Sequence, residues 1–600
     1  MTAAAVDTAP ARSMLDQDWR KLINWGLIVA LSQVFIALSN MPVKLDDRIL
    51  LEPVLSLGYL SILWLPAVVG YSVGKEKMLE GVVARAKGIA DIFAGALVGL
   101  IGGGGLSLLV VLIDNFDLRD PLVNWSPQTL EVLTFDGSVA SGVLIWLLVG
   151  AGLGAVGGAL LVLPDLARRV VRSIALVLLA VSILESVIRD LSEKPQLEGV
   201  TDWIYFIRGG LAIKGAIAIA IVTAAYVLFG HARVRETRAS FQALEGPART
   251  KANTVVIAVG GVLLLVLPML VGKITNELLA NVGLFVLLAL GLNIVVGLAG
   301  VLDLGYVAFF AVGGYTTAVL TSPNSPGYSP ELPWFLVVFV VVVLAGLSGL
   351  LIGAPVIRMR GDYLAIVTLG FGEIIRLLFL SDWLSGWTGG AQGITRVPGV
   401  QVFGLATVRG TDPKAVFYLV MVFCAIAIYI SWRLERSRLG RAWMAIREDE
   451  SVAEAMGINT VNVKLMAFVV GAVLAAFSGA IFAAKVGAVF PQSFIILVSI
   501  IILVVVIVGG MGNIVGVIAG AVVLIGVLGG PSQPGLLQEF SEFKLLIYGA
   551  LLVWMMLKRP EGLIPNVRRS RELHQDEFLQ DAWLKGELDT DDDGGEVAPA

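Results

Sequence analysis

Cysteine and histidine are almost missing from this chain of 600 residues, which carries one cysteine and two histidines. Cys424 has no second cysteine with which to form a disulfide, and His231 and His574 are too few for a cluster of zinc ligands. Nor do His, Asp and Glu group at metal-binding spacing, and no nucleophile has a base nearby. We therefore expect no metal, no cofactor bound by this chain and no enzymatic activity.

Charged residues are also scarce, at 15% of the sequence, and the formal net charge is −4. A chain with so little charge of one sign gives no reason to expect nucleic acid as a partner. The Gly-x-x-x-x-Gly-Lys-[Ser/Thr] loop that holds nucleotide phosphates is missing too, and no polar stretch could house a nucleotide-binding domain. A process driven by ATP would thus require another subunit to bind the nucleotide.

Hydrophobic residues, in contrast, make up 57% of the chain, far more than in soluble domains. The hydrocarbon core of a bilayer is about 30 Å thick, so a helix that crosses it needs roughly 20 apolar residues. Runs of this kind recur from Trp25 to Leu557. The sequence therefore predicts an all-α membrane protein that crosses the bilayer many times.

The apolar runs predict about sixteen transmembrane helices, about six in the first part of the chain and about ten in the second. The first set lies near residues 22–40, 51–73, 89–113, 139–163, 171–190 and 209–230. The second set lies near residues 254–272, 278–299, 304–321, 334–353, 363–381, 415–432, 464–485, 494–511, 514–529 and 544–557. The runs at 494–511 and 514–529 are short and broken by glycine, which is also typical of re-entrant segments.

Lysine and arginine predict the orientation, because they favour the cytosolic ends of short loops. They gather in alternate loops, at residues 75–87, 168–172, 233–251, 358–360, 433–447 and 558–571. The loop at 114–138, which the alternation places outside, is acidic apart from Arg119. We expect a multi-pass protein of a bacterial-type cytoplasmic (inner) membrane with both termini in the cytosol.

Composition also predicts the domain organisation. The parts are a cytosolic tail at 1–21, a transmembrane extension of about six helices at 22–230, a basic cytosolic linker at 231–252, a membrane core at 253–565 and an acidic, disordered tail at 566–600. Glycines at four-residue spacing, such as Gly95/Gly99 and Gly150/Gly154/Gly158, predict close packing between helices.

A loop at 433–464 within the core is too polar to cross a membrane and too patterned for a plain linker. It reads S-R-L-G-R-A-W-M-A-I-R-E-D-E-S-V-A-E-A-M-G-I-N at 437–459. Trp443, Ile446, Ala453 and Met456 recur at helical intervals, which predicts one short amphipathic helix ending near Gly457. From these residues alone, the helix either lies on the bilayer surface or docks against a partner.

This loop resembles the coupling region of ABC permeases, whose Glu-Ala-x-x-Gly pattern is present in the shortened form Glu454-Ala455-Met456-Gly457. Other stretches resemble the branched-chain amino acid permease family of the LivM type. They are A-L-G-L-N-I-V-V-G-L-A-G at 289–300, D-L-G-Y-V-A-F-F-A-V-G-G-Y at 303–315, R-G-D-Y-L-A-I-V-T-L-G-F-G-E-I-I-R at 360–376, G-G-M-G at 509–512 and K-R-P-E-G-L at 558–563.

The resemblance covers about residues 250–565. Residues 1–250 have no counterpart in the family's short N-terminus, and residues 529–543 replace a charged stretch that the family's pattern would place there. The role of the extension is therefore open. An accessory or scaffolding bundle is favoured over a second, fused permease, because the extension lacks the family's long glycine-rich motifs.

The resemblance implies the helical bundle of an ABC importer permease, with an ATPase-coupling role for one group of residues, Glu450, Glu454, Ala455, Met456 and Gly457. Polar residues of the neighbouring motifs are candidates for the pathway of a zwitterionic substrate: Asn293, Asp303, Tyr306, Thr316, Thr317, Thr368, Glu373 and Arg376. Glu373 and Arg376 are three residues apart in one span, so they are predicted to pair. A pair that only fixes helix packing fits the same spacing.

What the resemblance implies is a permease subunit of an ATP-driven importer for branched-chain or related amino acids, working by alternating access. The implied partners are cytosolic ABC ATPase subunits that bind ATP, a second permease subunit and an extracytoplasmic substrate-binding protein, within a lipid bilayer. One alternative is a permease of the same family for urea or short amides. Another is a stand-alone ion-driven secondary transporter, which would predict an inverted repeat, and the sequence has no convincing one.

Overall fold

The computed structural model describes residues 19–51, 55–79, 89–191, 198–206, 209–230, 246–357, 359, 362–402, 406–531, 533, 535–537 and 540–564. The predicted tail at 566–600, most of the tail at 1–21 and residues 231–245 of the predicted linker lie outside these residues. The chain divides into two compact units, Met1–Val259 and Gly260–Ala600. Each unit is described by itself.

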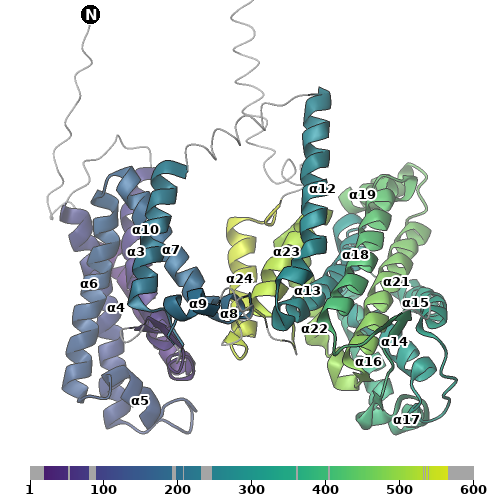
Figure 1. Ribbon diagram of the computed structural model, residues 1–600, viewed down its shortest axis with the longest axis horizontal. Coiled ribbons are helices and arrows are strands. Elements are labelled where there is room, and N and C mark those ends of the chain that lie inside the picture. The colour runs from purple at the N-terminus through teal and green to yellow at the C-terminus, as the bar shows by residue number, and fades with distance from the viewer. Residues whose placement is uncertain are drawn as a thin grey trace, which may run out of the picture. The chain divides into compact units, whose positions relative to one another are not determined.

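The first unit is built around four helices that pack on one another (Figure 1). They are α1 (Trp19–Leu38), α3 (Leu57–Leu79), α4 (Ile89–Asn115) and α6 (Val139–Val162). The shorter elements between them are α2 (Met41–Lys44), β1 (Ile49–Leu51), β2 (Leu55–Ser56) and α5 (Pro127–Thr134), with β1 and β2 antiparallel. The rest of the unit is α7 (Asp165–Ile183), α8 (Glu185–Leu191), α9 (Glu198–Ile204), α10 (Ile213–Ala225) and the π-helix η2 (Tyr226–Gly230).

Glycine allows α4 and α6 to approach at backbone distance. A Cβ added to Gly99 would lie 2.0 Å from the carbonyl oxygen of Gly150, and one added to Gly95 would lie 2.2 Å from that of Gly154. Any side chain at these positions would collide with the facing backbone. The close packing predicted from the four-residue glycine spacing is therefore present, as expected for helices that associate in lipid through small residues.

The second unit contains the longer run of helices. Up to the end of α17 its elements are α12 (Gly246–Leu270), which begins before the unit boundary, α13 (Lys273–Leu292), η3 (Asn293–Leu298), α14 (Val307–Thr321), α15 (Trp334–Val356), α16 (Asp362–Leu380) and α17 (Asp382–Thr388). They are followed by η4 (Gly390–Gln392), β3 (Ile394–Thr395), β4 (Val400–Val402), β5 (Ala406–Val408), α18 (Pro413–Glu435), α19 (Arg438–Glu448), α20 (Glu450–Ala455) and α21 (Thr460–Val486). The last elements are β6 (Ala488–Val489), η5 (Pro491–Phe494), α22 (Ile496–Gly509), α23 (Ile514–Leu528) and α24 (Lys544–Lys558).

Two helices form the centre of this unit. α21 packs on α13, α14 and α15, and α13 packs in turn on α18 and α23 (Figure 1). Most of α13 and η3 is buried, and the apolar core runs along both central helices. The short strands are antiparallel pairs, β3 with β6 and β4 with β5. They join loops at the end of the bundle where α21 finishes.

Ten helices in the described part of the chain are long and apolar enough to cross a membrane, and each matches one of the predicted runs. Four more predicted runs form shorter apolar helices, Leu57–Val73, Ala258–Leu270, Val307–Thr321 and Ile514–Leu528. The runs predicted at 171–190 and 544–557 correspond to α7 and α24. α7 begins at Asp165 and includes the basic residues at 168–172, so its apolar part is short. The all-α, multi-pass fold is confirmed, with fewer full-length helices than the predicted sixteen or so.

Candidate functional site

The polar loop between α18 and α21 folds into two helices rather than the single helix predicted. The hydroxyl of Ser437 caps α19 by accepting a hydrogen bond from the Gly440 N–H (3.2 Å). At Asp449 the backbone is extended, and its carboxylate caps α20 through the N–H groups of Ser451 (2.8 Å) and Val452 (3.1 Å). The prediction was wrong because Asp449 offers these amides a side-chain acceptor in place of a helical carbonyl.

Hydrogen bonds to the Asp449 carboxylate also lower its pKa. Hydrogen bonds from the Ser451 hydroxyl (2.6 Å) and from the Val452 N–H hold the pKa of this carboxyl below its usual range. Asp449 therefore stays ionised at neutral pH, where it caps the start of α20.

The apolar side of this loop faces the rest of the chain. Trp443, Ile446 and Ala453 are buried, and the Trp443 Nε1–H donates to the carbonyl oxygen of Val463 at the start of α21 (2.7 Å). Met456, the fourth residue of the predicted stripe, is 79% exposed, since it follows the last turn of α20. Most of the stripe is thus covered from within the chain, and only its end is available to a partner.

Two charged side chains tie the loop to the membrane helices. Lys464 at the start of α21 pairs with Glu450 (Nζ to Oε1, 2.6 Å). Arg447 donates from Nη1 to the carbonyl oxygen of Gly297 in η3 (2.6 Å). Sequence reasoning missed both contacts, because it placed Arg447 only in the basic cluster at 433–447 and Lys464 only at the start of a predicted span.

The five residues assigned to ATPase coupling fall into two groups. Glu450 is partly covered by its ion pair with Lys464. Glu454, Ala455, Met456 and Gly457 are exposed, and a Cβ added to Gly457 would meet nothing within 4 Å. Gly457 has a φ of +86°, which favours glycine at the end of α20. The exposed group forms an edge with one apolar and one acidic side chain, which suits a protein groove.

Of the eight candidate pathway residues, Asn293 lies at the start of η3, where α13 continues as a π-helix. Its Oδ1 accepts the N–H of Gly512 from the turn between α22 and α23 (2.8 Å). After η3 the chain turns through Gly300, which has a φ of +71° and packs against the stem of Arg447. The π-helix is therefore held by the polar loop on one side and by the α22–α23 hairpin on the other.

Three further candidates surround the turn between η3 and α14. Asp303 is buried; its Oδ1 accepts the N–H of Gly305 (2.9 Å), while Oδ2 has no hydrogen-bond partner among the described residues. Thr368 of α16 accepts the N–H of Leu304 through Oγ1 (3.0 Å). Tyr306 is fully buried and donates from its hydroxyl to the carbonyl oxygen of Gly471 (2.8 Å). These side chains fasten one turn to α16 and α21.

The remaining candidates form other contacts. Thr317 is buried and donates to the Gly313 carbonyl of its own helix (2.9 Å), whereas Thr316 is half-buried. On α16 the predicted ion pair is present, since Arg376 Nε lies 3.0 Å from both Glu373 oxygens. Both side chains of the pair are partly exposed. Seven of the eight residues thus form a turn cluster (Asp303, Tyr306 and Thr368), the Asn293 bond to Gly512, a helix-internal bond of Thr317 and the Glu373–Arg376 ion pair.

Metal binding has no support in the described part of the chain, where no three His, Cys, Asp or Glu residues lie close enough together to hold an ion. An apolar hollow of about 750 Å³ in the second unit is lined by other residues than the eight candidates.

Comparison with known proteins gives one consistent result. A family described as the branched-chain amino acid transport system permease component matches residues 274–556. The permease protein LivM of the high-affinity branched-chain amino acid transport system of Salmonella typhimurium is 38% identical over 330 residues, which cover 51% of this chain and 73% of that protein. LivM of Escherichia coli K12 is 38% identical over 326 residues, with the same coverage.

A second kind of permease is also similar. LivH of Escherichia coli K12 is 26% identical over 299 residues, or 48% of this chain and 93% of that protein. No solved structure matches the chain. The region that the family matches lies within the second unit and includes the polar loop and the η3 turn.

Proposed function

This chain belongs to the branched-chain amino acid transport system permease family, and on that premise we propose that it is the membrane subunit of an ATP-driven ABC importer for branched-chain or related amino acids. In this proposal the chain forms the passage and binds no nucleotide, as its lack of a phosphate loop suggests. It is a transport subunit, without a reaction of its own.

The observation that carries the proposal is the construction of α19 and α20. Their inner side is tied to α21 through Trp443 and Lys464, and to η3 through Arg447. Their outer edge, from Glu454 to Gly457, is exposed. An element that is fixed to the membrane helices and open to the cytosol suits the transfer of motion from an ATPase.

This arrangement supports a mechanism of alternating access. When ATP draws the ATPase subunits together, they would displace the edge of α20, and α21 and η3 would move with it because their attachments are direct. η3 is a π-helix, an element that occurs frequently at functional sites within α-helices. Through Asp303, Tyr306 and Thr368, this movement would shift the facing surfaces of α14 and α16. The substrate passage would then close on one side of the membrane and open on the other.

The substrate class is inferred from the named relatives and from the chemistry of the candidates. A zwitterionic amino acid needs donors for its carboxylate, acceptors for its ammonium group and an apolar surface for its side chain. The partly exposed Glu373–Arg376 pair can supply both kinds of polar group, whereas Asn293, Tyr306 and Thr317 are buried and bonded to backbone groups. The pair is therefore the first candidate for substrate contact.

The proposed partners are two cytosolic ATPase subunits, a second permease subunit and an extracytoplasmic binding protein that delivers the amino acid. The chain would lie in the cytoplasmic membrane with both termini in the cytosol, as the placement of lysine and arginine indicates. The acidic loop at 114–138 would then lie outside.

The test is uptake into vesicles that contain the full chain, its neighbouring permease and ATPase subunits, with the binding protein added outside. We expect accumulation of radiolabelled leucine that requires ATP on the ATPase side. Uptake of urea or a short amide in place of leucine would show that this chain is a urea or amide permease of the same family. Uptake by this chain alone, driven by a sodium or proton gradient, would contradict the proposal.

A further inference from the structure

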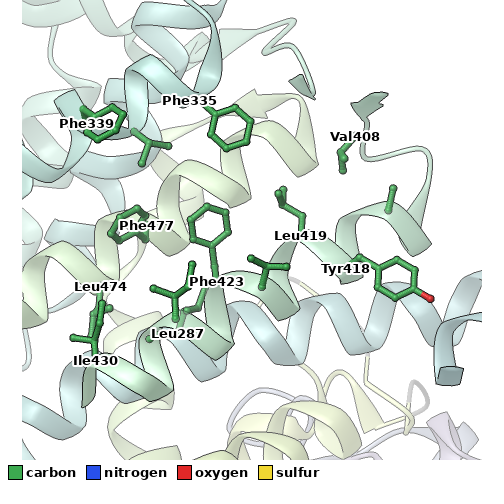
Figure 2. A pocket seen from close by; sticks show the side chains of 15 residues that line it. Leu287, Phe335, Phe339, Val408, Tyr418, Leu419, Phe423, Ile430, Leu474 and Phe477 are labelled. Atoms are coloured by element: carbon green, nitrogen blue, oxygen red, sulfur yellow. The ribbon is translucent and has the colours of Figure 1, made fainter. Parts of the chain in front are cut away.

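A long apolar groove lies on the second unit between two helices that do not cover each other (Figure 2). α15 and α18 both pack on α21, and the space between them has a volume of about 750 Å³. The rings of Phe335, Phe339, Phe423 and Phe477 surround it in Figure 2. Among the lining residues that the structure describes, only Tyr418 has a polar group, and its hydroxyl donates to the Leu265 carbonyl (2.8 Å).

The groove is long enough for a lipid tail. α18 lines it with one stripe from Ala415 through Val422 to Ile430. At a rise of 1.5 Å per residue, this stripe is about 22 Å long, which is more than the roughly 15 Å that one leaflet, and so one lipid tail, contributes to a hydrocarbon core of about 30 Å. Val422 is 53% exposed and Phe339 is 73% exposed, so the groove is open along its side.

The lining suits a flexible chain better than another helix. Where helices of this unit meet at backbone distance, glycine lies at the contact: a Cβ added to Gly313 would be 2.1 Å from the Ala476 carbonyl oxygen, and one added to Gly479 would be 2.1 Å from that of Phe310. No glycine lines the described surface of the groove, and apart from Ala415 and Ala427 the lining side chains are aromatic or branched. Helices in lipid associate through small residues, whereas acyl chains fill irregular surfaces between large ones.

The end of the stripe carries groups that recognise a phosphate at the membrane surface. One turn beyond Ile430 lies Arg433, which is exposed. Tyr429 and Trp432, whose ring centroids are 6.4 Å apart, are exposed beside it, and the Arg436 guanidinium lies 4.3 Å from the Trp432 ring centroid. Exposed aromatic rings and arginine are typical of the level of the lipid headgroups, and a guanidinium binds phosphate oxygens in pairs.

We propose that this groove binds one acyl chain of a glycerophospholipid, with the lipid phosphate against Arg433. Arginines at 433, 436 and 438 at this end favour an anionic headgroup. The bound lipid would hold α15 and α18 apart while both stay attached to α21. This inference requires only that the chain spans a membrane, so it does not depend on the transported substrate.

The test is native mass spectrometry of the full chain, purified in mild detergent and incubated with phosphatidylglycerol or with diacylglycerol of the same tails. We expect one phosphatidylglycerol on the wild-type protein and on Ala425→Trp, which adds the same ring to an exposed position of α18 outside the groove. Val422→Trp, which fills the groove, should lose the lipid. Arg433→Gln should lose the preference for phosphatidylglycerol over diacylglycerol.

Two results would overturn the inference. One is equal lipid retention by the wild type, Val422→Trp and Ala425→Trp, which would place the lipid elsewhere. The other is a groove without lipid in the wild type together with a Val422→Trp variant that no longer co-purifies with the second permease subunit, which would make the groove a protein interface.

Discussion

Arg447 joins two parts of the fold that are 150 positions apart in the sequence. Its guanidinium donates to the carbonyl of Gly297, near the end of η3, where carbonyl groups lack the next helical turn as a partner. A cation at the carboxyl end of a helix is also favoured by the helix dipole. This side chain thus makes the most direct link between the polar loop and the buried helix α13–η3.

Replacing Arg447 with alanine should lower the amount of leucine transported per ATP hydrolysed by about tenfold. A hydrogen bond to a charged group contributes about 1.5–3 kcal/mol, and about 1.4 kcal/mol corresponds to a factor of ten. The measurement is uptake and ATP hydrolysis in the same vesicles. Arg441→Ala is the matched control, because Arg441 is exposed on the same helix and donates only to the nearby Arg436 carbonyl (3.1 Å) in the described hydrogen bonds. Equal losses in both variants would contradict a special role for Arg447.

At the residue scale the sequence predicts contacts that depend on local spacing. Glu373 and Arg376 are three positions apart in a helix, so their pairing could be predicted before the structure was known. The contact of Arg447 with Gly297, and that of Asn293 with Gly512, could not, because no spacing rule relates residues so far apart. Such contacts follow only from the packing of whole helices.

At the scale of elements, the contact between α4 and α6 could also be predicted from local spacing in the sequence. Glycine at four-residue spacing predicts close packing, and the structure places the glycines of the two helices against each other. What the spacing could not predict was the break at Asp449, since one helix and two short helices have the same apolar periodicity. Two helices form because the Asp449 side chain caps the start of the second one.

Gly99→Ala should destabilise the first unit, whereas Gly152→Ala should not. The added Cβ would lie 2.0 Å from the Gly150 carbonyl oxygen in the first variant, and would meet nothing within 4 Å in the second. Overpacking of this kind costs about 1–3 kcal/mol, while alanine is favoured over glycine in an exposed helix by up to about 1 kcal/mol. Thermal unfolding of the purified chain in detergent compares them. A Gly99→Ala variant as stable as wild type would show that the helices can move apart without loss.

At the scale of the whole molecule, the apolar cores of the two units are separate. One core runs from Ala280 to Met555, and the others lie between Leu22 and Trp146. The family match at residues 274–556 lies within the second unit. Hydrophobic runs were enough to predict an all-α membrane fold, but a sequence of apolar helices does not say which of them share a core.

Removing residues 1–238 should leave a chain that inserts and assembles with its partners, because the second unit keeps its own core and all the family motifs. Assembly is measured by co-purification of the second permease and ATPase subunits, and transport by leucine uptake. If assembly is kept but uptake is lost, the extension has a function in transport. If assembly fails, the second unit depends on the first, and the prediction that it assembles independently is wrong.

The central claim is that ATP hydrolysis by partner subunits drives transport through the exposed edge of α20. The most direct measurement is the number of ATP molecules hydrolysed per leucine transported, in vesicles with the wild type, Glu454→Arg or Gly457→Pro. Arginine reverses the charge presented to a docking groove, and proline distorts the end of α20, but neither change reaches the membrane helices. Asp117→Arg, an exposed charge reversal in the acidic loop of the first unit, is the control.

We predict that Glu454→Arg and Gly457→Pro stay folded and hydrolyse more ATP per leucine than the wild type, while Asp117→Arg keeps the wild-type ratio. Co-purification of the ATPase subunits separates loss of docking from loss of transmission. Normal uptake with the wild-type ratio in both α20 variants would contradict the account.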